Sequence, residues 1–173
     1  MTLIVIHGVE STGKTTLGRR MAGTIGGVFL PEYGRAFCEI HGTDVSIDDL
    51  IAISRAQQAN IEVALSERPI VVSDTDSLMT AAWARMMHGT TPPALMTARK
   101  ADLYLHCAPD TPFVQDGVRI FGEPAARARF DVIARQVLAD AAVKTVEVAG
   151  PWDQRDSTAA LAVERLLQRV HRL

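Results

Sequence analysis

The sequence predicts an α/β fold in three layers: one mostly parallel, five-stranded sheet with helices on both faces. Short apolar runs rich in Val, Ile and Leu alternate with longer segments in which apolar residues recur at helical spacing. No linker, internal repeat or low-complexity tract divides the 173 residues, of which 47% are hydrophobic. That length and composition suit one core, so we expect a single domain over residues 1–173.

The elements follow one another regularly along the chain. Residues 3–6 are a run of Leu, Ile and Val, typical of a strand buried on both faces. Leu17, Met21 and Ile25 then mark a helix over residues 15–25, which Gly26-Gly27 ends. The other expected strands are residues 28–30, 70–72, 103–107 and 143–148. The other expected helices are residues 47–67 after the N-cap Ser46, 77–88, a short one after the loop 89–93, 125–142 and 157–170.

Composition limits the classes of partner. The formal net charge is −2 with both signs interspersed, so we expect no nucleic-acid-binding face. No stretch approaches the ~20 apolar residues of a membrane span, and Met1 leads into the first strand without a secretory signal. Cys38 and Cys107, two cysteines far apart, suit reduced thiols, so we expect a cytoplasmic protein. The oligomeric state is left open.

Residues 8–15 carry the strongest motif. They read Gly-Val-Glu-Ser-Thr-Gly-Lys-Thr, a full match to the phosphate-binding loop G-x-x-x-x-G-K-[ST]. Gly8 and Gly13 allow a tight loop whose N–H groups face phosphate oxygens, Lys14 reaches the β- and γ-phosphates, and the Thr15 hydroxyl binds Mg²⁺. The flanking strand and helix disfavour a merely structural glycine-rich turn, so a P-loop NTPase fold is predicted. The expected ATP-binding residues here are Gly8, Glu10, Ser11, Thr12, Gly13, Lys14, Thr15 and Thr16.

Polar residues follow the second and third expected strands. Asp74 ends an apolar run. In P-loop enzymes an acidic residue at this position holds Mg²⁺, but an Asp at the end of a strand is also often the N-cap of the next helix. Three roles are open for Asp76: a helix cap, a residue that supports a metal ligand, or a contact to the substrate. Glu32 can accept hydrogen bonds from substrate hydroxyls and Arg35 can bind an anion, the alternative being a surface ion pair. Because carboxyl ends of parallel strands share an edge, we expect a ligand there.

Later segments supply further candidates. Residues about 110–130 are predicted to form a lid, beginning as a mobile loop, in which Arg119 stabilises transferred charge; Asp116 is assigned to the substrate. Arg127 and Arg129 are either part of that lid or ordinary solvated charges. Trp152 or Arg155, in an expected exposed loop over residues 151–155, can stack on the nucleotide base, unless the tryptophan packs on the last helix. Trp83 is expected in the core.

Missing features narrow the class. The sequence holds no Asn-Lys-x-Asp, so guanine-specific recognition is not supported, and the chain is short for a motor or a ring ATPase. A small phosphoryl-transfer enzyme remains, which needs positioned substrates, neutralised charge and excluded water.

The combined motifs resemble a known family. Residues 8–17, Glu-Tyr-Gly-Arg at 32–35, Ser-Asp-Thr-Asp at 73–76 and Asp-Gly-Val-Arg at 116–119 are similar in order and spacing to the ribosylnicotinamide kinase domain of NadR-type proteins. The resemblance runs from residue 3 to about 170. It implies ATP- and Mg²⁺-dependent phosphorylation of the 5′-hydroxyl of nicotinamide riboside, which gives nicotinamide mononucleotide in NAD salvage.

The resemblance also implies roles for individual residues. Lys14 and Thr15 serve the phosphates and metal, Asp74 is the metal acid or general base, Glu32 and Arg35 lie in the acceptor pocket, and Arg119 belongs to the lid. Which of Asp74, Asp76 and Glu32 accepts the hydroxyl proton is left open.

Two positions differ from the family pattern. Pro31 replaces an aromatic residue that stacks on the pyridine ring, so Tyr33 or Phe29 is the candidate substitute, and Phe113 replaces a tryptophan in the lid. NadR-type chains usually carry an adenylyltransferase domain before this one, and none is present in this sequence, so only the kinase step is expected. The alternatives are an ATP-binding sensor or accessory module, and a kinase of another nucleoside or a nucleotide.

Overall fold

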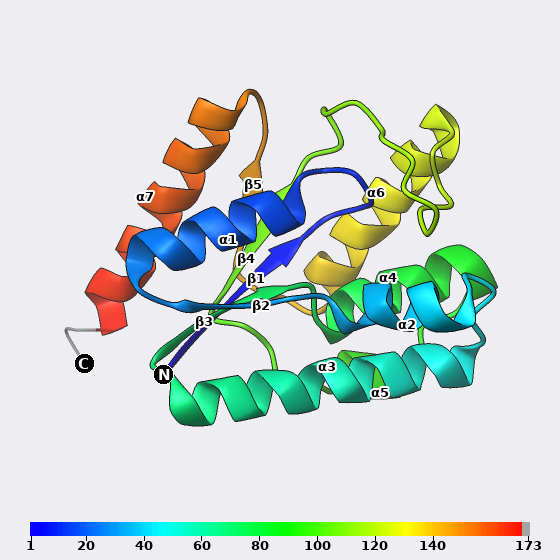
Figure 1. Ribbon diagram of the computed structural model, residues 1–173, viewed down its shortest axis with the longest axis horizontal. Helices are drawn as coiled ribbons and strands as arrows, with labels where there is room; N and C mark the ends of the chain where they lie inside the picture. The colour runs from blue at the N-terminus through cyan, green and yellow to red at the C-terminus, as the bar shows by residue number, and fades with distance from the viewer. Residues whose placement is uncertain (171–173) are drawn as a thin grey trace.

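The computed structural model describes residues 1–170 and is built around one five-stranded sheet (Figure 1). The strands are β1 (Thr2–His7), β2 (Val28–Leu30), β3 (Ile70–Asp74), β4 (Leu103–Cys107) and β5 (Thr145–Val148). Their order in the sheet is β2-β3-β1-β4-β5, and every neighbouring pair is parallel. The predicted five-stranded α/β fold is therefore confirmed, with a sheet that is parallel throughout.

Helices connect the strands. Their bounds are α1 (Lys14–Ile25), α2 (Tyr33–His41), α3 (Ile47–Glu67), α4 (Ser77–His88), α5 (Pro93–Met96), α6 (Pro124–Asp140) and α7 (Trp152–Val170). The chain steps outward from β1 to β2, then turns back through β3 to β4 and β5. Because crossover connections between parallel strands are right-handed, this reversal places α1 on one face and the helices of the return path on the other.

Two hydrophobic clusters fill the space between the layers. In β1, Leu3 and Val5 belong to the cluster under α3, α4 and α6, whereas Ile4 and Ile6 belong to the cluster under α1 and α7. This alternation is what a strand buried on both faces requires. Figure 1 shows α1 and α7 together on one side of the sheet, with α3 and α4 on the other. The three-layer prediction is confirmed.

The long helix α3 begins as its sequence predicts. The Ser46 hydroxyl accepts the Asp49 N–H at 3.2 Å, and the Asp49 carboxylate accepts the Ser46 N–H at 2.9 Å. This reciprocal pair is a capping box, which satisfies two backbone donors at the helix start. At its other end the helix stops at Glu67, before Arg68-Pro69.

Two parts of the element prediction are wrong. Helix α2 was not among the expected helices; Phe37 and Cys38 pack partly buried on the core while most of the helix is exposed, so an amphipathic pattern was present in the sequence and was missed. Helix α7 begins at Trp152, so residues 152–155 are its first turn and the expected exposed loop does not exist. The Gly150-Pro151 pair suggested a loop, but Pro is compatible with a helix start.

Smaller boundary differences remain. Strand β3 extends to Asp74, β5 begins at Thr145, and α6 spans Pro124–Asp140. Residues 171–173 of the expected domain lie outside the described residues. Within residues 1–170, no helix combines the length and apolar character needed to cross a membrane.

Candidate active site

The phosphate-binding loop joins β1 to α1 at the carboxyl end of the sheet. A side chain is excluded at Gly8 (φ 132°), where a Cβ would lie 2.6 Å from the Cys107 carbonyl oxygen, and at Gly13 (φ 82°), where it would meet the Trp152 ring at 2.8 Å. The half-buried Lys14 donates from Nζ to the Val9 carbonyl at 3.0 Å. Its ammonium group is thus folded over the loop, beside the start of α1, which favours an anion.

Thr15 and Asp74 meet beside this loop, as both were expected to do. The Thr15 hydroxyl donates to Asp74 Oδ2 at 2.5 Å, and Asp74 Oδ1 is buried with no hydrogen-bond partner among the described residues. A hydroxyl beside a carboxylate oxygen that lacks a partner is the hard oxygen donor set that Mg²⁺ prefers. These two residues therefore fit a divalent cation.

Asp76 has the capping role among its three expected alternatives. Its Oδ1 accepts the Leu78 and Met79 N–H groups at the start of α4, and its Oδ2 accepts the Tyr104 hydroxyl at 2.6 Å. The residue is 1% exposed and does not line the cavity beside the phosphate loop. Burial raises the pKa of this carboxyl, against the lowering effect of these hydrogen bonds. Both oxygens of Asp76 thus bond to groups of the protein outside the cavity.

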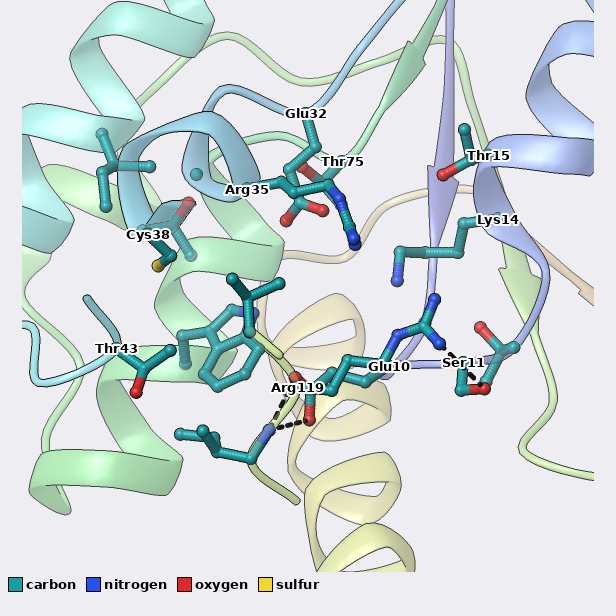
Figure 2. Close-up of a pocket in the computed structure, with 18 of the residues that line it drawn as sticks. Glu10, Ser11, Lys14, Thr15, Glu32, Arg35, Cys38, Thr43, Thr75 and Arg119 are labelled. Atoms are coloured by element: carbon teal, nitrogen blue, oxygen red, sulfur yellow. Dashed lines mark hydrogen bonds between the residues drawn. The ribbon is translucent and has the colours of Figure 1, made fainter. Parts of the chain in front are cut away.

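Glu32 is the N-cap residue of α2, and its side chain points into the cavity. Figure 2 shows Glu32 and Arg35 on one side of this cavity and Lys14 and Thr15 on the other. The pKa of Glu32 is raised to about 7, because desolvation, with help from the nearby carboxylates of Asp74 and Glu10, outweighs the lowering effect of Lys14 and Arg35. A carboxyl group that titrates near neutrality inside a ligand cavity is a candidate general base.

Arg35 and Arg119 meet at one carboxylate. Asp116 accepts a hydrogen bond from Arg35 at 2.6 Å and pairs with Arg119 at 3.1 Å, and Arg35 also pairs with Glu39 at 3.2 Å. Arg35 and Arg119 line the cavity, whereas Asp116 does not. The structure thus joins α2 to the lid through Asp116.

The lid was expected over about residues 110–130, but its last residues belong to α6, which begins at Pro124; the part without regular structure, residues 110–123, is called the lid below and packs on the phosphate loop. The Glu10 carboxylate accepts the N–H groups of Ile120 at 3.1 Å and of Phe121 at 2.9 Å, and the Ser11 hydroxyl accepts the Val114 N–H at 2.9 Å. Dashed lines in Figure 2 mark the hydrogen bonds from Ile120 to Glu10, with the Arg119 side chain nearby. Glu10 was expected to hold nucleotide; in this structure it holds the lid.

Arg127 anchors the base of the lid, a role that its sequence context left open. It is 9% exposed and donates to the carbonyls of Thr111 at 2.7 Å and Ser11 at 3.1 Å. Arg129 is exposed on α6. Sequence analysis gave Arg127 and Arg129 the same alternatives, but the structure places Arg127 in a buried contact and Arg129 in solvent.

Arg155 supports the phosphate loop from behind. It is 1% exposed and donates to the carbonyl oxygens of Thr12 at 3.0 Å, Gly150 at 2.7 Å and Ala108 at 3.2 Å, and it pairs with Asp110. The expectation of an exposed Arg155 that stacks on a base is therefore wrong.

Trp152 lies at the outer edge of the loop. It is 36% exposed, its ring contacts the position of Gly13, and the Arg20 guanidinium lies 4.7 Å from the ring centroid. A nucleotide contact at Trp152 stays a prediction. Neither Trp152 nor Tyr33 lines the cavity, so Tyr33 is not placed to stack in it.

Away from the phosphate loop, the cavity continues into a part that we call the side pocket. Its lining comes from the loop before α3, from α3 and α4, and from the lid; the apolar members are Val45, Leu50, Ile53, Trp83, Met87 and Ile120, and the polar members include Thr43 and Thr80. Trp83 packs on Phe121 and Phe130, with ring centroids 5.5 and 4.7 Å apart, and also lines this pocket. The core assignment of Trp83 was therefore incomplete, because an apolar helix face can border a cavity.

Gln57 is a second residue that sequence analysis missed. It is 2% exposed, lines the cavity from α3, and bonds to residues on both sides of Glu32. A signal was present, because Gln57 lies at helical spacing among Leu50, Ile53 and Ile61, which are all buried. A polar residue on a buried apolar face needs partners and deserves a functional test.

Comparisons with known proteins show the family and the fold of the chain. A family model that describes an AAA domain (AAA_28) matches residues 3–155. The trifunctional NAD biosynthesis/regulator protein NadR of Salmonella typhimurium and that of Escherichia coli are each 29% identical over 154 residues, which is 84% of this chain and 37% of the relative. The chain thus spans little more than a third of these relatives. The expected resemblance to NadR-type proteins is confirmed.

Solved structures support the fold. Thymidylate kinase from Ehrlichia chaffeensis has a TM-score of 0.68 at 14% identity and covers 95% of this chain and 98% of its own. Thymidylate kinase from Candida albicans has a TM-score of 0.70 at 14% identity, with 98% and 93% covered. At this identity the likeness shows a shared three-layer α/β fold.

Proposed function

The chain belongs to the AAA domain family matched above, and from that premise we propose that it is an ATP- and Mg²⁺-dependent kinase of nicotinamide riboside or a related nucleoside. One observation carries the proposal. The Glu32 carboxyl, with a pKa of about 7, lies between the phosphate loop and an apolar pocket that contains an aromatic ring. A nucleoside kinase needs these three parts: a phosphate site, a proton acceptor and a site for the ring of its acceptor.

On the phosphate side, the loop N–H groups and Lys14 would bind the triphosphate and stabilise charge on the transferred group. Thr15 and Asp74 would hold Mg²⁺, which when bound neutralises charge on the β- and γ-phosphates. Arg119 and the lid contacts of Glu10 and Ser11 would exclude water from the site.

On the acceptor side, Glu32 would accept the proton of the 5′-hydroxyl. The hydroxyl oxygen forms a bond to the γ-phosphorus while the bond from that phosphorus to the β,γ-bridging oxygen breaks, and ADP leaves with the electron pair. Asp76 does not line the cavity, and Asp74 is hydrogen-bonded to Thr15 and assigned to Mg²⁺, so Glu32 fits this role better than either. The catalytic set is then Lys14, Asp74, Glu32 and Arg119.

The side pocket suits a flat ring. The indole face of Trp83 attracts a cationic ring such as a pyridinium, and the hydroxyls of Thr43 and Thr80, which line the same cavity, can hydrogen-bond a polar group on that ring. Trp83 thus supplies an aromatic surface although Pro31 does not. This chemistry favours nicotinamide riboside within the nucleosides.

A nucleotide acceptor is the second candidate, and the arginine pairing argues against it. A phosphate on the acceptor needs a free cation, but Arg35 pairs with Asp116 and Glu39, and Arg119 pairs with Asp116. Both arginines would have to leave these carboxylates before binding a phosphate. Because the chain shares its fold with thymidylate kinases, nucleoside monophosphates are nevertheless included in the assay below.

A direct assay tests the proposal. Purified protein is incubated with ATP, Mg²⁺ and a panel containing nicotinamide riboside, the common nucleosides and their monophosphates; ADP release and product mass are followed. We expect nicotinamide riboside to stimulate ADP release most strongly and to gain one phosphate. ATP binding without stimulation by any compound would instead support the ATP-binding sensor. Stimulation by another compound alone would reassign the acceptor.

A further inference from the structure

Gln57 lies on the buried face of α3, where the carboxyl ends of β2 and β3 approach the helix. Only 2% of the residue is exposed. Its amide is nevertheless fully used, and the orientation of that amide follows from its partners, because only the amide oxygen can accept a backbone N–H. Each contact goes to a residue that is a sequence neighbour of a carboxylate in the site.

One set of contacts surrounds Glu32. The Gln57 Oε1 atom accepts the Tyr33 N–H at 2.7 Å, and Nε2 donates to the Pro31 carbonyl at 3.4 Å. Pro31 and Tyr33 are the residues immediately before and after Glu32. The glutamine thus holds the backbone on both sides of the proposed base, at the junction between β2 and α2.

The other set of contacts surrounds Asp74. Gln57 Nε2 also donates to the Ser73 hydroxyl at 3.0 Å, and that hydroxyl donates to the Thr75 carbonyl at 2.8 Å. Ser73 and Thr75 are the residues before and after Asp74, and Thr75 has a left-handed backbone with φ 67°. A non-glycine residue in this region is strained and needs such support.

We infer that Gln57 is a positioning residue that holds Glu32 and Asp74 in register across the β2–β3 edge. The inference rests on the proposed function, since it assigns catalytic roles to both carboxylates. Its physical basis is rigidity: one buried amide ties together the backbone segments that carry the two groups. A displacement of about 1 Å in a reacting group can reduce a rate about a hundredfold, so such a tie affects turnover.

The kinetic test compares Gln57→Leu with Gln58→Leu. Gln58 is the matched control, because it is the next residue on α3 and its amide bonds to Glu62 on the same helix. We expect Gln57→Leu to lower kcat about tenfold or more with the KM for ATP unchanged, and Gln58→Leu to change neither. A rise in the KM for the nucleoside with kcat unchanged would mean direct substrate binding and would overturn the inference.

A double-mutant cycle separates positioning from general destabilisation. If Gln57 acts through Glu32 as well as through Asp74, Gln57→Leu should lower kcat by a smaller factor in a Glu32→Gln background than in wild type, with the remaining loss due to Asp74. An equal loss in both backgrounds would show that Gln57 does not act through Glu32. Ser73→Ala, which removes one link of the network, should give a smaller loss of kcat and serves if Gln57→Leu does not fold.

A measurement without substrate keeps this test independent of the proposed function. The Glu32 carboxyl is titrated by carbon NMR in wild type, Gln57→Leu, Ser73→Ala and Gln58→Leu. Loosening the turn should hydrate the Glu32 carboxyl. Its pKa should therefore fall from about 7 in Gln57→Leu and in Ser73→Ala, but not in Gln58→Leu. The charges facing it are Lys14, Arg35, Asp74 and Glu10, which are the same in all four proteins.

The outcomes are distinct. Wild type that phosphorylates no nucleoside refutes the proposed function, while the Glu32 titration still decides whether Gln57 holds the carboxyl. An unchanged Glu32 pKa in both Gln57→Leu and Ser73→Ala refutes the positioning role even if the enzyme is active.

Discussion

The phosphate loop and the side pocket adjoin each other at the carboxyl end of the sheet, but they are built differently. The loop is one continuous segment whose binding groups are mainly backbone N–H groups. The side pocket takes its lining from two helices, the loop before α3 and the lid. A site made by one segment can be identified from a local motif, whereas a pocket made by several segments exists only after they pack.

The phosphate loop is not wholly independent of the rest of the chain, because Arg155 supports it. Its guanidinium bonds to the Thr12 carbonyl from 143 residues away, so the continuous loop also depends on a remote residue. Substitutions in the two regions should therefore separate binding of ATP, binding of the nucleoside and stability of the fold.

The largest effect is expected for Lys14→Ala on the phosphate side. We expect kcat/KM to fall by about a thousandfold, because the ammonium group stabilises charge on the transferred phosphate. The melting temperature should change little, since Lys14 makes a single loop contact, to Val9. Steady-state kinetics and thermal unfolding check this, with the exposed Lys144→Ala as control; near-normal turnover would contradict the site assignment.

Glu32→Gln tests the junction of the two regions. We expect kcat to fall about a hundredfold or more. In wild type, kcat/KM should decline below pH 7 because protonation near a pKa of about 7 removes the base, and the variant should lack this decline. A pH–rate profile that keeps the decline in Glu32→Gln would assign the base elsewhere.

The same substitution has an opposite effect on stability. The raised pKa of Glu32 means that the folded state favours the protonated form, so this group's favourable contribution is present below its ordinary pKa and is lost as pH rises through about 7. Glu32→Gln should therefore melt at a higher temperature than wild type at pH 8, and the difference should shrink at pH 5.

Arg155→Met tests the remote support of the loop. Removing the buried guanidinium leaves three carbonyl oxygens and Asp110 without their donor, so we expect a loss of about 3 kcal/mol in unfolding free energy. Denaturant unfolding measures it, and Arg165→Met, at an exposed position of the same helix, is the control. A loss of ATP affinity without destabilisation would favour direct contact with nucleotide instead.

The smallest effect is a crossed pair of tryptophan substitutions. Trp83→Leu should raise the KM for the nucleoside about two- to tenfold and leave that for ATP unchanged, because ring stacking contributes about 0.5–1.5 kcal/mol. Trp152→Leu should do the reverse. If both variants affect the same substrate, the division between phosphate loop and side pocket is wrong.

Features of the chain that depend on short-range pattern were predictable. The alternation of strands and helices, the capping box at Ser46 and the pairing of Thr15 with Asp74 all follow from local sequence and from strand ends that share one edge of the sheet. Helix α2 and the first turn of α7 were not predicted, because α2 is short and has no fully buried residue, and because both elements are held by contacts with distant residues.

By itself, the sequence determined the fold class and the phosphate loop, since hydrophobic periodicity and glycine spacing act over a few residues. Only the tertiary structure decided the roles of four polar or aromatic residues: Asp76 caps a helix, Arg155 is buried behind the loop, Trp83 borders a pocket, and Gln57 joins the backbones around two carboxylates. The physical reason is that a side chain's role depends on the partners that burial brings to it, and those partners lie far away in the sequence.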